Sequence, residues 1–491
     1  MVKSSGGQRE SEGAVVPVIG VHENAPGGKG PHFGQACHGG KRKGMAGTAR
    51  PNSPERLPPL DNVRKLQRKL WVAAKRHPGR RFHALYDRIY RGDVLWEAWE
   101  RVRANRGAAG VDRVTLTAVE AYGVERMLGE LERDLRAGRY RPQPVLRREI
   151  PKPTGGVRPL GIPTVRDRVA QQAARIVLEP IFEADFLSSS YGYRPRRSAT
   201  AALEAIRTAF PRGYAHVVDA DIRDFFGSID HGRLLSAVAE RVSDRRVLKL
   251  VRTWLEAGVM EEGRLSETVT GTPQGGVISP LLSNVYLHAF DRMWAEQGHG
   301  VLVRYADDFV VLCQTPDAAE EAREQVERVL ALLSLELNPE KTRVVDLSEG
   351  RQGFDFLGCH FRARVSGRLL ERGIRRYYLH RWPSPRSMKR IRAKIRERTG
   401  PNRAGARDIR VVIDDLTPVL RGWGNYFRTG NASRTFVQVD DYAEMRLRRL
   451  LRRRHGRNLR PGRAEQWTSD WFRELGLYRL RGTIRYPGVA L

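Results

Sequence analysis

Apolar positions recur at helical and strand spacing through most of the chain and predict short, mixed elements. Residues 65–103 have a helical pattern that is dense in Arg and Trp. Residues 150–162 predict two short strands around a Gly-Gly turn. A helix is expected next, because apolar residues then fall at i, i+4, i+7 and i+8, namely Val169, Ala173, Ile176 and Val177.

The middle of the chain continues this mixture. We expect a strand at 216–222, a helix over 234–255, a loop entering a helix over 271–290 and a hairpin at 301–312. One face of a further helix is marked by Val326, Val329, Leu330 and Leu333. Because strands and helices do not alternate strictly, the pattern favours an α+β core.

Both ends of the chain have a different character. Beyond about residue 375, Met388, Ile391 and Ile395 keep a narrow apolar stripe while Lys and Arg crowd the other faces, and residues 446–454 repeat this pattern. We therefore predict a separate, helical, basic module. Residues 1–60 are rich in Gly, Pro, Ser, Lys and Arg without an apolar period, which predicts a disordered basic tail.

Charge narrows the possible partners. The 491 residues suggest two to four domains, and a formal net charge of +31 with clustered Arg indicates a polyanion, above all nucleic acid. There is no apolar run of about 18 residues and no secretory pattern, so we expect no membrane partner. Three cysteines without a C-x-x-C pair exclude a disulfide framework, and Cys313 and Cys359 are expected to be buried. These features predict an intracellular, cytoplasmic and nucleoid-associated protein.

Two adjacent carboxylates, Asp307 and Asp308, lie between two apolar runs of the predicted hairpin. Asp favours turns, so turn geometry alone could explain them. Held on a rigid hairpin, however, they also provide hard oxygen ligands for Mg²⁺. Asp221 ends an upstream apolar strand, with Ile222 on the opposite face and Asp219 as a weaker candidate. If the two strands are neighbours, Asp221 and Asp307 face each other and could hold two metal ions about 4 Å apart for nucleotidyl transfer.

Five segments resemble group II intron reverse transcriptases in their order and spacing, from about residue 80 to the C-terminus. They are Ala220–Phe226 (ADIRDFF), Thr272–Asn284 (TPQGGVISPLLSN), Tyr305–Asp308 (YADD), Leu337–Lys341 (LNPEK) and Phe356–Gly358 (FLG). The resemblance implies an α+β right-hand polymerase (fingers and palm) followed by an all-α thumb/maturase domain. The expected divisions are 61–215 for the N-terminal extension and fingers with part of the palm, 216–365 for the palm, and 366–491 for the thumb/maturase domain.

The same resemblance implies roles for individual residues. Asp221, Asp307 and Asp308 match the family's metal-binding aspartates, with Asp308 the least direct ligand. Ile222, next to Asp221, is included at the metal site. Phe226 matches the aromatic ring that blocks a nucleotide 2′-hydroxyl, although a core aromatic would give the same pattern.

Four further residues are expected to handle the nucleotide. Gln274 matches a residue that contacts the incoming nucleotide, and Gly275 beside it would permit close backbone approach to template or substrate. Lys152 and Arg158 would grip the triphosphate, although a solvated charged face remains an alternative. Lys341 matches a lysine proposed to protonate the pyrophosphate, and a helix-end charge near Pro339 is the other interpretation.

Residues 416–427 closely resemble the maturase module that follows the polymerase in this family and holds the folded intron RNA. The combination of charge and flat rings suits phosphate contacts and base stacking. Trp423 and Phe427, at i and i+4, fit the core of a helix bundle equally well. The RNA-binding candidates are Arg421, Trp423, Tyr426, Arg446, Arg449 and Arg453.

The resemblance predicts an RNA-directed DNA polymerase and intron maturase that uses two Mg²⁺ ions. Its expected partners are group II intron RNA, an RNA template with a DNA or RNA primer, a DNA target and dNTPs. Paired Cys and His residues of a C-terminal endonuclease are not found before Leu491, so second-strand cleavage is not expected. The alternatives are a domesticated or defence-associated reverse transcriptase without an intron, or a splicing-only maturase; the intact carboxylates and Gln274 argue against decay of the polymerase site.

Overall fold

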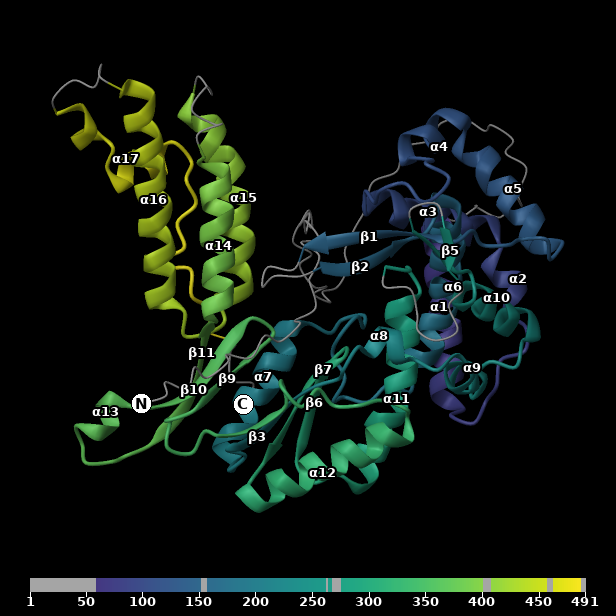
Figure 1. Cartoon of the computed structure of the whole chain (residues 1–491), viewed down its shortest axis with the longest axis horizontal. Coiled ribbons are helices and arrows are strands. Elements are labelled where there is room, and N and C mark those ends of the chain that lie inside the picture. The colour runs from purple at the N-terminus through teal and green to yellow at the C-terminus, as the bar shows by residue number, and fades with distance from the viewer. Residues whose placement is uncertain are drawn as a thin grey trace, which may run out of the picture.

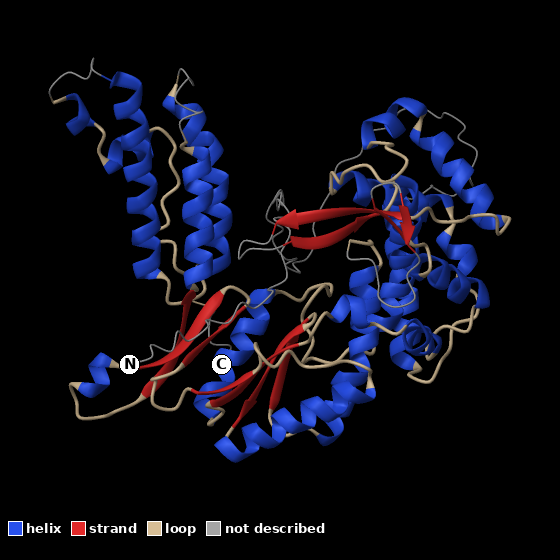
Figure 2. Cartoon of the chain, in the orientation of Figure 1, coloured by secondary structure: helices blue, strands red, loops and turns tan. Residues whose placement is uncertain are grey.

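The computed structural model describes residues 59–151, 157–261, 264–266, 275–400, 408–456 and 462–486. Figure 1 shows a mainly helical lobe at the N-terminal side, two sheets below and a bundle of long helices at the C-terminal side, and Figure 2 separates helices from strands. The predicted α+β mixture is confirmed. The predicted tail over residues 1–60 lies outside the described residues except for its last two positions, Pro59 and Leu60, which open the first helix.

The N-terminal lobe combines helices with a small sheet. Its helices are α1 (Pro59–Arg76), α2 (Tyr86–Ile89), α3 (Gly92–Ala104), α4 (Leu116–Tyr122), α5 (Val124–Arg136) and α6 (Val165–Glu183). Its sheet has the order β2-β1-β4-β5, formed by β1 (Val145–Pro151), β2 (Val157–Ile162), β4 (Val259–Glu261) and β5 (Arg264–Ser266). The helical pattern of 65–103 and the paired strands of 150–162 are thus confirmed, while the Gly-Gly turn lies outside the described residues.

The central sheet has both faces buried along three of its four strands. Its order is β6-β7-β3-β8, with β3 (His216–Asp221), β6 (Val301–Tyr305), β7 (Asp308–Cys313) and β8 (Arg343–Asp346). Along β3, Val218 and Ala220 join one hydrophobic core while Val217 joins the other. This explains why these strands are continuous apolar runs rather than alternating ones.

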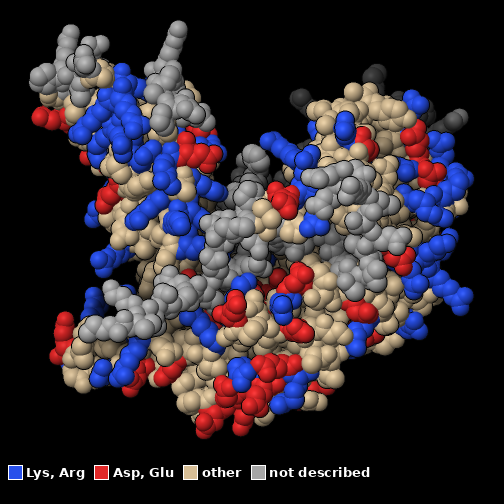
Figure 3. All heavy atoms as spheres, viewed as in Figure 1, with Lys and Arg blue, Asp and Glu red and all other residues tan. Residues whose placement is uncertain are grey.

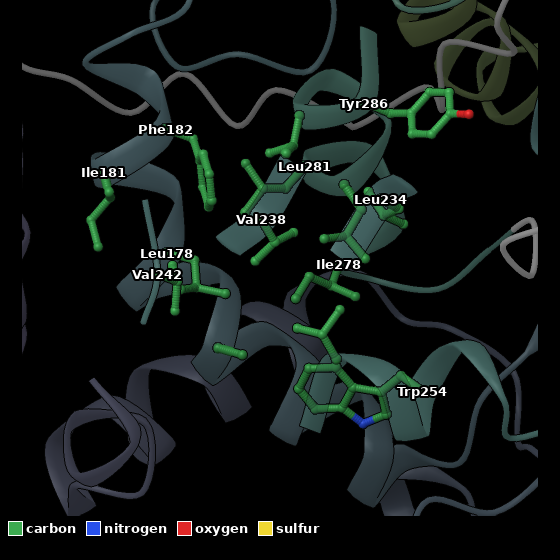
Figure 4. Packing of buried hydrophobic residues seen from close by; sticks show 14 of the residues in the cluster. Leu178, Ile181, Phe182, Leu234, Val238, Val242, Trp254, Ile278, Leu281 and Tyr286 are labelled. Atoms are coloured by element: carbon green, nitrogen blue, oxygen red, sulfur yellow. The ribbon is translucent and has the colours of Figure 1, made fainter. Parts of the chain in front are cut away.

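The first core lies between the central sheet and the helices of the N-terminal side. Figure 4 shows Phe182, Val238, Leu281 and neighbouring side chains converging from different helices. The helices around this part are α8 (Phe225–Ser228), α9 (His231–Ala239), α10 (Arg245–Leu255), α11 (Ser279–Gln297) and α12 (Pro316–Leu332), whereas α7 (Ala199–Ala209) packs in the second core.

The single helix predicted over 234–255 is wrong, because the chain breaks it into α9 and α10. Val242 forms a backbone bridge with Phe82 between them, and this pairing takes the chain out of helical geometry. The carboxylate of Asp244 then accepts the amide of Arg246 and caps the second helix. A distant strand contact therefore overrides the helical period.

The C-terminal part combines a third sheet with a helical bundle. The third sheet has the order β11-β10-β9, with β9 (Gly353–Phe356), β10 (Cys359–Val365), β11 (Tyr377–Pro383) and the short α13 (Gly367–Leu370) between the last two. The bundle consists of α14 (Pro385–Arg398), α15 (Ile409–Phe427), α16 (Ser433–His455), a 3-10 turn (Arg463–Gln466) and α17 (Ser469–Glu474). The boundary expected at 365/366 falls inside the hairpin of β10 and β11, so the sheet continues to Pro383 before the bundle begins.

The second core joins the central sheet, the third sheet and the bundle. The stripe of Met388, Ile391 and Ile395 is buried in it, as predicted. Cys313 and Cys359 are buried free thiols, also as expected, whereas Cys37 lies outside the described residues. Within the described ranges, no helix is both long and apolar enough to cross a membrane.

Candidate active site

The register of the central sheet brings the predicted carboxylates together. β3 and β7 are antiparallel neighbours, with Asp221 directly opposite Asp308. The expectation that the two strands are neighbours is confirmed, but Asp308 rather than Asp307 faces Asp221. Asp307 lies in the two-residue turn between β6 and β7, beside Ala306, whose φ is +60°. Directly opposed residues place their Cβ atoms about 4.5–5.5 Å apart.

The segment after Asp221 is fixed by a second chain segment that carries Lys341. The main-chain carbonyl of Asp221 accepts from the main-chain N–H of Asn338 at 2.8 Å, and a backbone bridge joins Ile222 to Leu337. This pairing brings the Lys341 Nζ to 3.2 Å from Asp221 Oδ2, with the lysine side chain 18% exposed. Lys341 is therefore not a solvent-facing charge at the end of a helix.

The carboxylates at this edge of the sheet are the type of ligand that a hard divalent cation prefers, and their backbone positions lie next to one another. Two carboxylates lie on adjacent strands and a third lies in the adjoining turn, and carboxylate oxygens are the ligands that Mg²⁺ prefers. The buried side chain of Ile222 leaves only its main-chain carbonyl as a possible contribution. Among the residues that the structure describes, no three His, Cys, Asp or Glu side chains form a ready metal-binding cluster. The ammonium of Lys341 on Asp221 occupies the place of a neutralising cation.

A fully buried arginine holds the turn of the candidate site, and the sequence analysis did not identify it. Arg304 and Asp291 are both 0% exposed and form a bidentate ion pair. The Arg304 guanidinium also donates to Asn284 Oδ1 at 3.2 Å, to Ser190 Oγ at 2.9 Å and to the carbonyl of Ala306 at 2.9 Å. The signal in the sequence was an Arg inside an apolar strand, where a charge needs a buried partner.

The segment beneath the turn leaves no room for a side chain. A Cβ on Gly192 would lie 2.4 Å from the amide nitrogen of Ala306. Asn284 donates to the carbonyl of Gly192 at 2.8 Å, so the same asparagine contacts both this segment and Arg304. The left-handed backbone of Ala306 is thus held from two sides.

The nucleotide-handling candidates are only partly covered by the described residues. Phe226 is half-buried and meets the buried Phe225 edge-on at 5.2 Å, so the second ring of the pair is the one that reaches the surface. Lys152 and Gln274 lie outside the described residues, and Arg158 is placed only by its backbone, opposite Ile150 in the β1–β2 pair.

The backbone of Gly275 lies close to another part of the protein, in β2. Its φ is +117°, and a Cβ there would lie 2.4 Å from the carbonyl oxygen of Gly161 in β2. The close backbone approach expected at this glycine is therefore made to the sheet of the N-terminal lobe.

Two aromatic candidates for RNA stacking are engaged in packing. The Trp423 ring lies 4.8 Å from Phe427 and 5.6 Å from Phe436, which fits the bundle-core interpretation. The Tyr426 hydroxyl donates to the carbonyl of Leu357 at 2.8 Å. Burial raises the pKa of Tyr426 well above its usual value, and Cys359, Tyr305 and Asp308 add to this effect while Arg381 opposes it.

The arginine candidates of the bundle differ in their surroundings. Arg446 is half-buried and donates to the Thr399 hydroxyl at 3.1 Å. Arg421, Arg449 and Arg453 are exposed, and the Arg421 guanidinium lies 5.3 Å from the ring centroid of Tyr478. Lys and Arg gather on the viewer's side of the bundle in Figure 3.

Comparison with known proteins places two family domains on this framework. Residues 150–361 match the reverse transcriptase (RNA-dependent DNA polymerase) family, and residues 388–467 match the group II intron maturase-specific domain. The first match contains the Asp221–Asp308 pair and the second covers most of the bundle. A reverse transcriptase domain implies the use of divalent metal, and the two domains together imply nucleic-acid partners.

Individual proteins are similar to parts of this chain. Protein YkfC of Escherichia coli K12 is 35% identical over 338 residues, which are 60% of this chain and 87% of YkfC. The group II intron-encoded protein LtrA of Lactococcus lactis is 38% identical over 212 residues, 43% of this chain, and the match spans only 35% of LtrA. A chain of a partial Cas6-RT-Cas1–Cas2 complex is similar with a TM-score of 0.32 and 25% identity, over 50% of this chain and 42% of that chain.

The fold agrees with a right-hand polymerase of fingers and palm followed by an all-α thumb/maturase domain. The two matched domains follow each other along the chain, and LtrA is an intron-encoded protein. The chain therefore belongs to the group II intron reverse transcriptase/maturase family and is an RNA-directed DNA polymerase.

Proposed function

We propose that this chain reverse-transcribes group II intron RNA by nucleotidyl transfer at Asp221, Asp307 and Asp308, with two Mg²⁺ ions as the metal. The observation that carries the proposal is the register that places Asp221 opposite Asp308, with Asp307 in the adjoining turn. When bound, the ions would activate a primer 3′-hydroxyl and stabilise the departing pyrophosphate. The primer is DNA or RNA, the template is RNA, and the substrates are dNTPs.

The roles of the protein groups follow from their positions. The three aspartates, with the carbonyl of Ile222, would hold the ions at the edge of the central sheet. Lys341 contacts Asp221 at 3.2 Å, and it would protonate the departing pyrophosphate next to that carboxylate. The half-buried ring of Phe226 would exclude a 2′-hydroxyl. Lys152, Arg158 and Gln274 remain our candidates for contacts to the triphosphate and base.

The bundle is proposed to hold the intron RNA and assist its splicing, in the bacterial cytoplasm where the DNA target lies in the nucleoid. Arg421, Arg449 and Arg453 are exposed on it and suit phosphate contacts. Trp423, Tyr426 and Arg446 are proposed to contribute by keeping the bundle in shape, because each is engaged with other protein groups.

Primer extension on an RNA template tests the proposal. The wild-type chain should extend a primer with dNTPs and Mg²⁺, and Asp307→Asn or Asp221→Asn should lower the rate by at least about 100-fold, as loss of a major electrostatic contribution does. Asp317→Asn is the matched control, because this exposed carboxylate lies in the first turn of α12. Full extension by Asp307→Asn would refute the assignment.

Splicing of the intron RNA that flanks the gene separates the maturase role from an intron-less reverse transcriptase. The chain should accelerate splicing at low Mg²⁺ with Asp307→Asn as effective as the wild type, because the RNA itself performs that chemistry. Extension without any effect on splicing would favour the domesticated or defence-associated alternative, and splicing without extension would favour the splicing-only one.

A further inference from the structure

The third sheet has one face in the second core and one face toward solvent. Its inner side chains are apolar and buried, as Phe354, Phe361 and Leu379 show. The side chains of the opposite face are half-buried or exposed. We define the outer face of the third sheet by seven of them: Asp355, His360, Arg362, Arg364, Tyr378, His380 and Trp382.

The strand register arranges the outer face in rows of rings and guanidinium groups. His360 is opposite Trp382, Arg362 is opposite His380, and Arg364 is opposite Tyr378. Residues opposite each other in a sheet point to the same side. Solvent-facing strands ordinarily carry mixed polar side chains, whereas this face has two imidazoles, two guanidinium groups and two larger aromatic rings.

These side chains are held in place by contacts with one another. The His360 and Trp382 rings are 5.1 Å apart, and the Arg364 guanidinium lies 4.6 Å from the Trp382 ring centroid. His360 Nδ1 lies 2.6 Å from the carboxylate of Asp355. Arg362 Nε donates to the carbonyl of Gly350 at 2.7 Å. The arrangement is therefore pre-organised, which lowers the entropic cost of binding a ligand.

The charge around this face selects an anionic partner. Between residues 350 and 383 the chain has eight arginines but only two acidic residues, Asp355 and Glu371. Of these arginines, Arg381 turns inward and is 1% exposed, whereas Arg372, Arg375 and Arg376 are exposed beyond α13. An anion that also offers flat rings for stacking is a single-stranded nucleic acid.

We propose that the outer face of the third sheet binds unpaired nucleotides of RNA, with bases stacked on Trp382 and Tyr378 and phosphates on Arg362 and Arg364. This surface is separate from the carboxylates of the central sheet and from the basic helices of the bundle. It gives the chain a second RNA contact, on the sheet that joins the palm to the thumb. The site is selective for unpaired strands because a base stacks on a ring only when it is free of its own helix.

Photo-crosslinking on the full chain tests this proposal at the level of residues. An oligouridine of about ten nucleotides, within the usual size of a single-strand site, carries 5-iodouridine and is mixed with the protein in EDTA to silence the polymerase site. We expect crosslinks at Trp382, His360 or Tyr378. Crosslinks confined to the bundle and the N-terminal lobe would overturn the proposal.

Binding of the same labelled oligouridine, followed by fluorescence anisotropy, measures the energetics. Trp382→Ala should weaken binding about tenfold, and Arg364→Gln should lower the salt slope by about 0.7. A duplex RNA of equal length should bind the wild type and Trp382→Ala alike. Arg351→Gln is the charge-matched control, because Arg351 is exposed and pairs only with Glu349 in the described contacts.

A replacement variant and two contrary results complete the test of RNA binding at this face. Tyr378→Leu, on the same face at 42% exposure, replaces Trp382→Ala if thermal melting shows that the latter does not fold. Wild-type affinity in Arg364→Gln and in the folded aromatic variant would refute the site. Exposed Leu370 and Ile374 near this face could instead serve a membrane surface. Binding to phosphatidylserine vesicles that the same variants abolish, with oligouridine binding intact, would replace RNA by lipid.

Discussion

Replacing Arg304 by methionine tests two roles of this buried guanidinium, one in folding and one in holding the turn that carries Asp307. The side chain is completely buried and forms an ion pair with the equally buried Asp291. The single substitution leaves the Asp291 carboxylate buried without its cation, and breaking such a pair costs about 3–5 kcal/mol. Since whole domains are stable by about 5–15 kcal/mol, Arg304→Met should unfold at a much lower urea concentration.

The double variant Arg304→Met/Asp291→Leu removes both charges and should recover most of the lost stability. Replacing a buried ion pair by apolar side chains of similar size is often neutral or stabilising. The double variant still lacks the donor to the carbonyl of Ala306. The left-handed φ of Ala306 costs about 1–2 kcal/mol and needs such support. Relaxation of the turn would shift Asp307 and Asp308, and a shift of about 1 Å costs about 100-fold in rate.

The assays are urea unfolding followed by circular dichroism, and single-turnover primer extension at a temperature where each variant is folded. We expect near wild-type stability in the double variant together with a 10- to 100-fold slower extension, an order-of-magnitude range. Arg323→Met is the control, because Arg323 pairs with Glu320 and Glu327 on the exposed face of α12 and should cost less than about 1 kcal/mol. A double variant that extends primers at the wild-type rate would refute the positioning role.

Three further predictions concern other parts of the chain. Phe226→Val should raise the incorporation of ribonucleotides relative to deoxynucleotides by at least about tenfold, measured by competing rNTP and dNTP in primer extension, because a smaller side chain leaves room for the 2′-hydroxyl. Burial lowers the pKa of His288 to about 4 from 6.5, so its neutral form is favoured in the fold. The free energy of unfolding is therefore not reduced by this histidine above about pH 6.5, and it falls by about 3 kcal/mol in all as the pH falls toward 4, because the unfolded state then binds the proton more tightly. His288→Leu should weaken this loss of stability at acid pH in urea unfolding. The exposed His83→Gln, as the control, should not. Arg449→Gln with Arg453→Gln should weaken intron RNA binding uniformly and reduce the salt slope by about 1 for each lost phosphate contact, and an unchanged slope would remove both from the RNA surface.

The sequence predicted β3, β6 and β7 because both faces of these strands are buried, whereas β8, with Arg343 and Val344 exposed, was not predicted. Apolar runs on either side of Asp307 and Asp308 could only be a buried hairpin, and that is what β6 and β7 form. The pairing of β3 with β7 is a contact between segments more than 80 residues apart, and the motifs alone suggested it. The register was beyond reach, because no hairpin turn joins β3 to β7 and the local pattern does not decide whether Asp307 or Asp308 faces Asp221.

Other features could not be predicted because they depend on distant partners. The break between α9 and α10 follows from pairing with Phe82, which the local helical period does not contain. The contact of Lys341 with Asp221 depends on the bridge between Ile222 and Leu337. The sequence spacing of Trp423 fits a core position and an RNA contact equally well. The rings of Phe427 and Phe436 beside it favour the core position.

Arginine shows most clearly why sequence alone misleads in so basic a chain. With a net charge of +31, each Arg invites interpretation as an RNA contact, yet some are interior parts of the fold. Arg304 donates to the carbonyl of Ala306 in the turn that carries Asp307, and Arg381 pairs with Glu204 and donates to Thr429 at the base of the bundle. Substituting either would weaken RNA-dependent activity without removing any contact to RNA. Burial distinguishes the two classes, so a loss of activity at Arg304 or Arg381 reports on the geometry between turn and bundle, whereas a loss at an exposed residue such as Arg449 reports on the RNA surface itself.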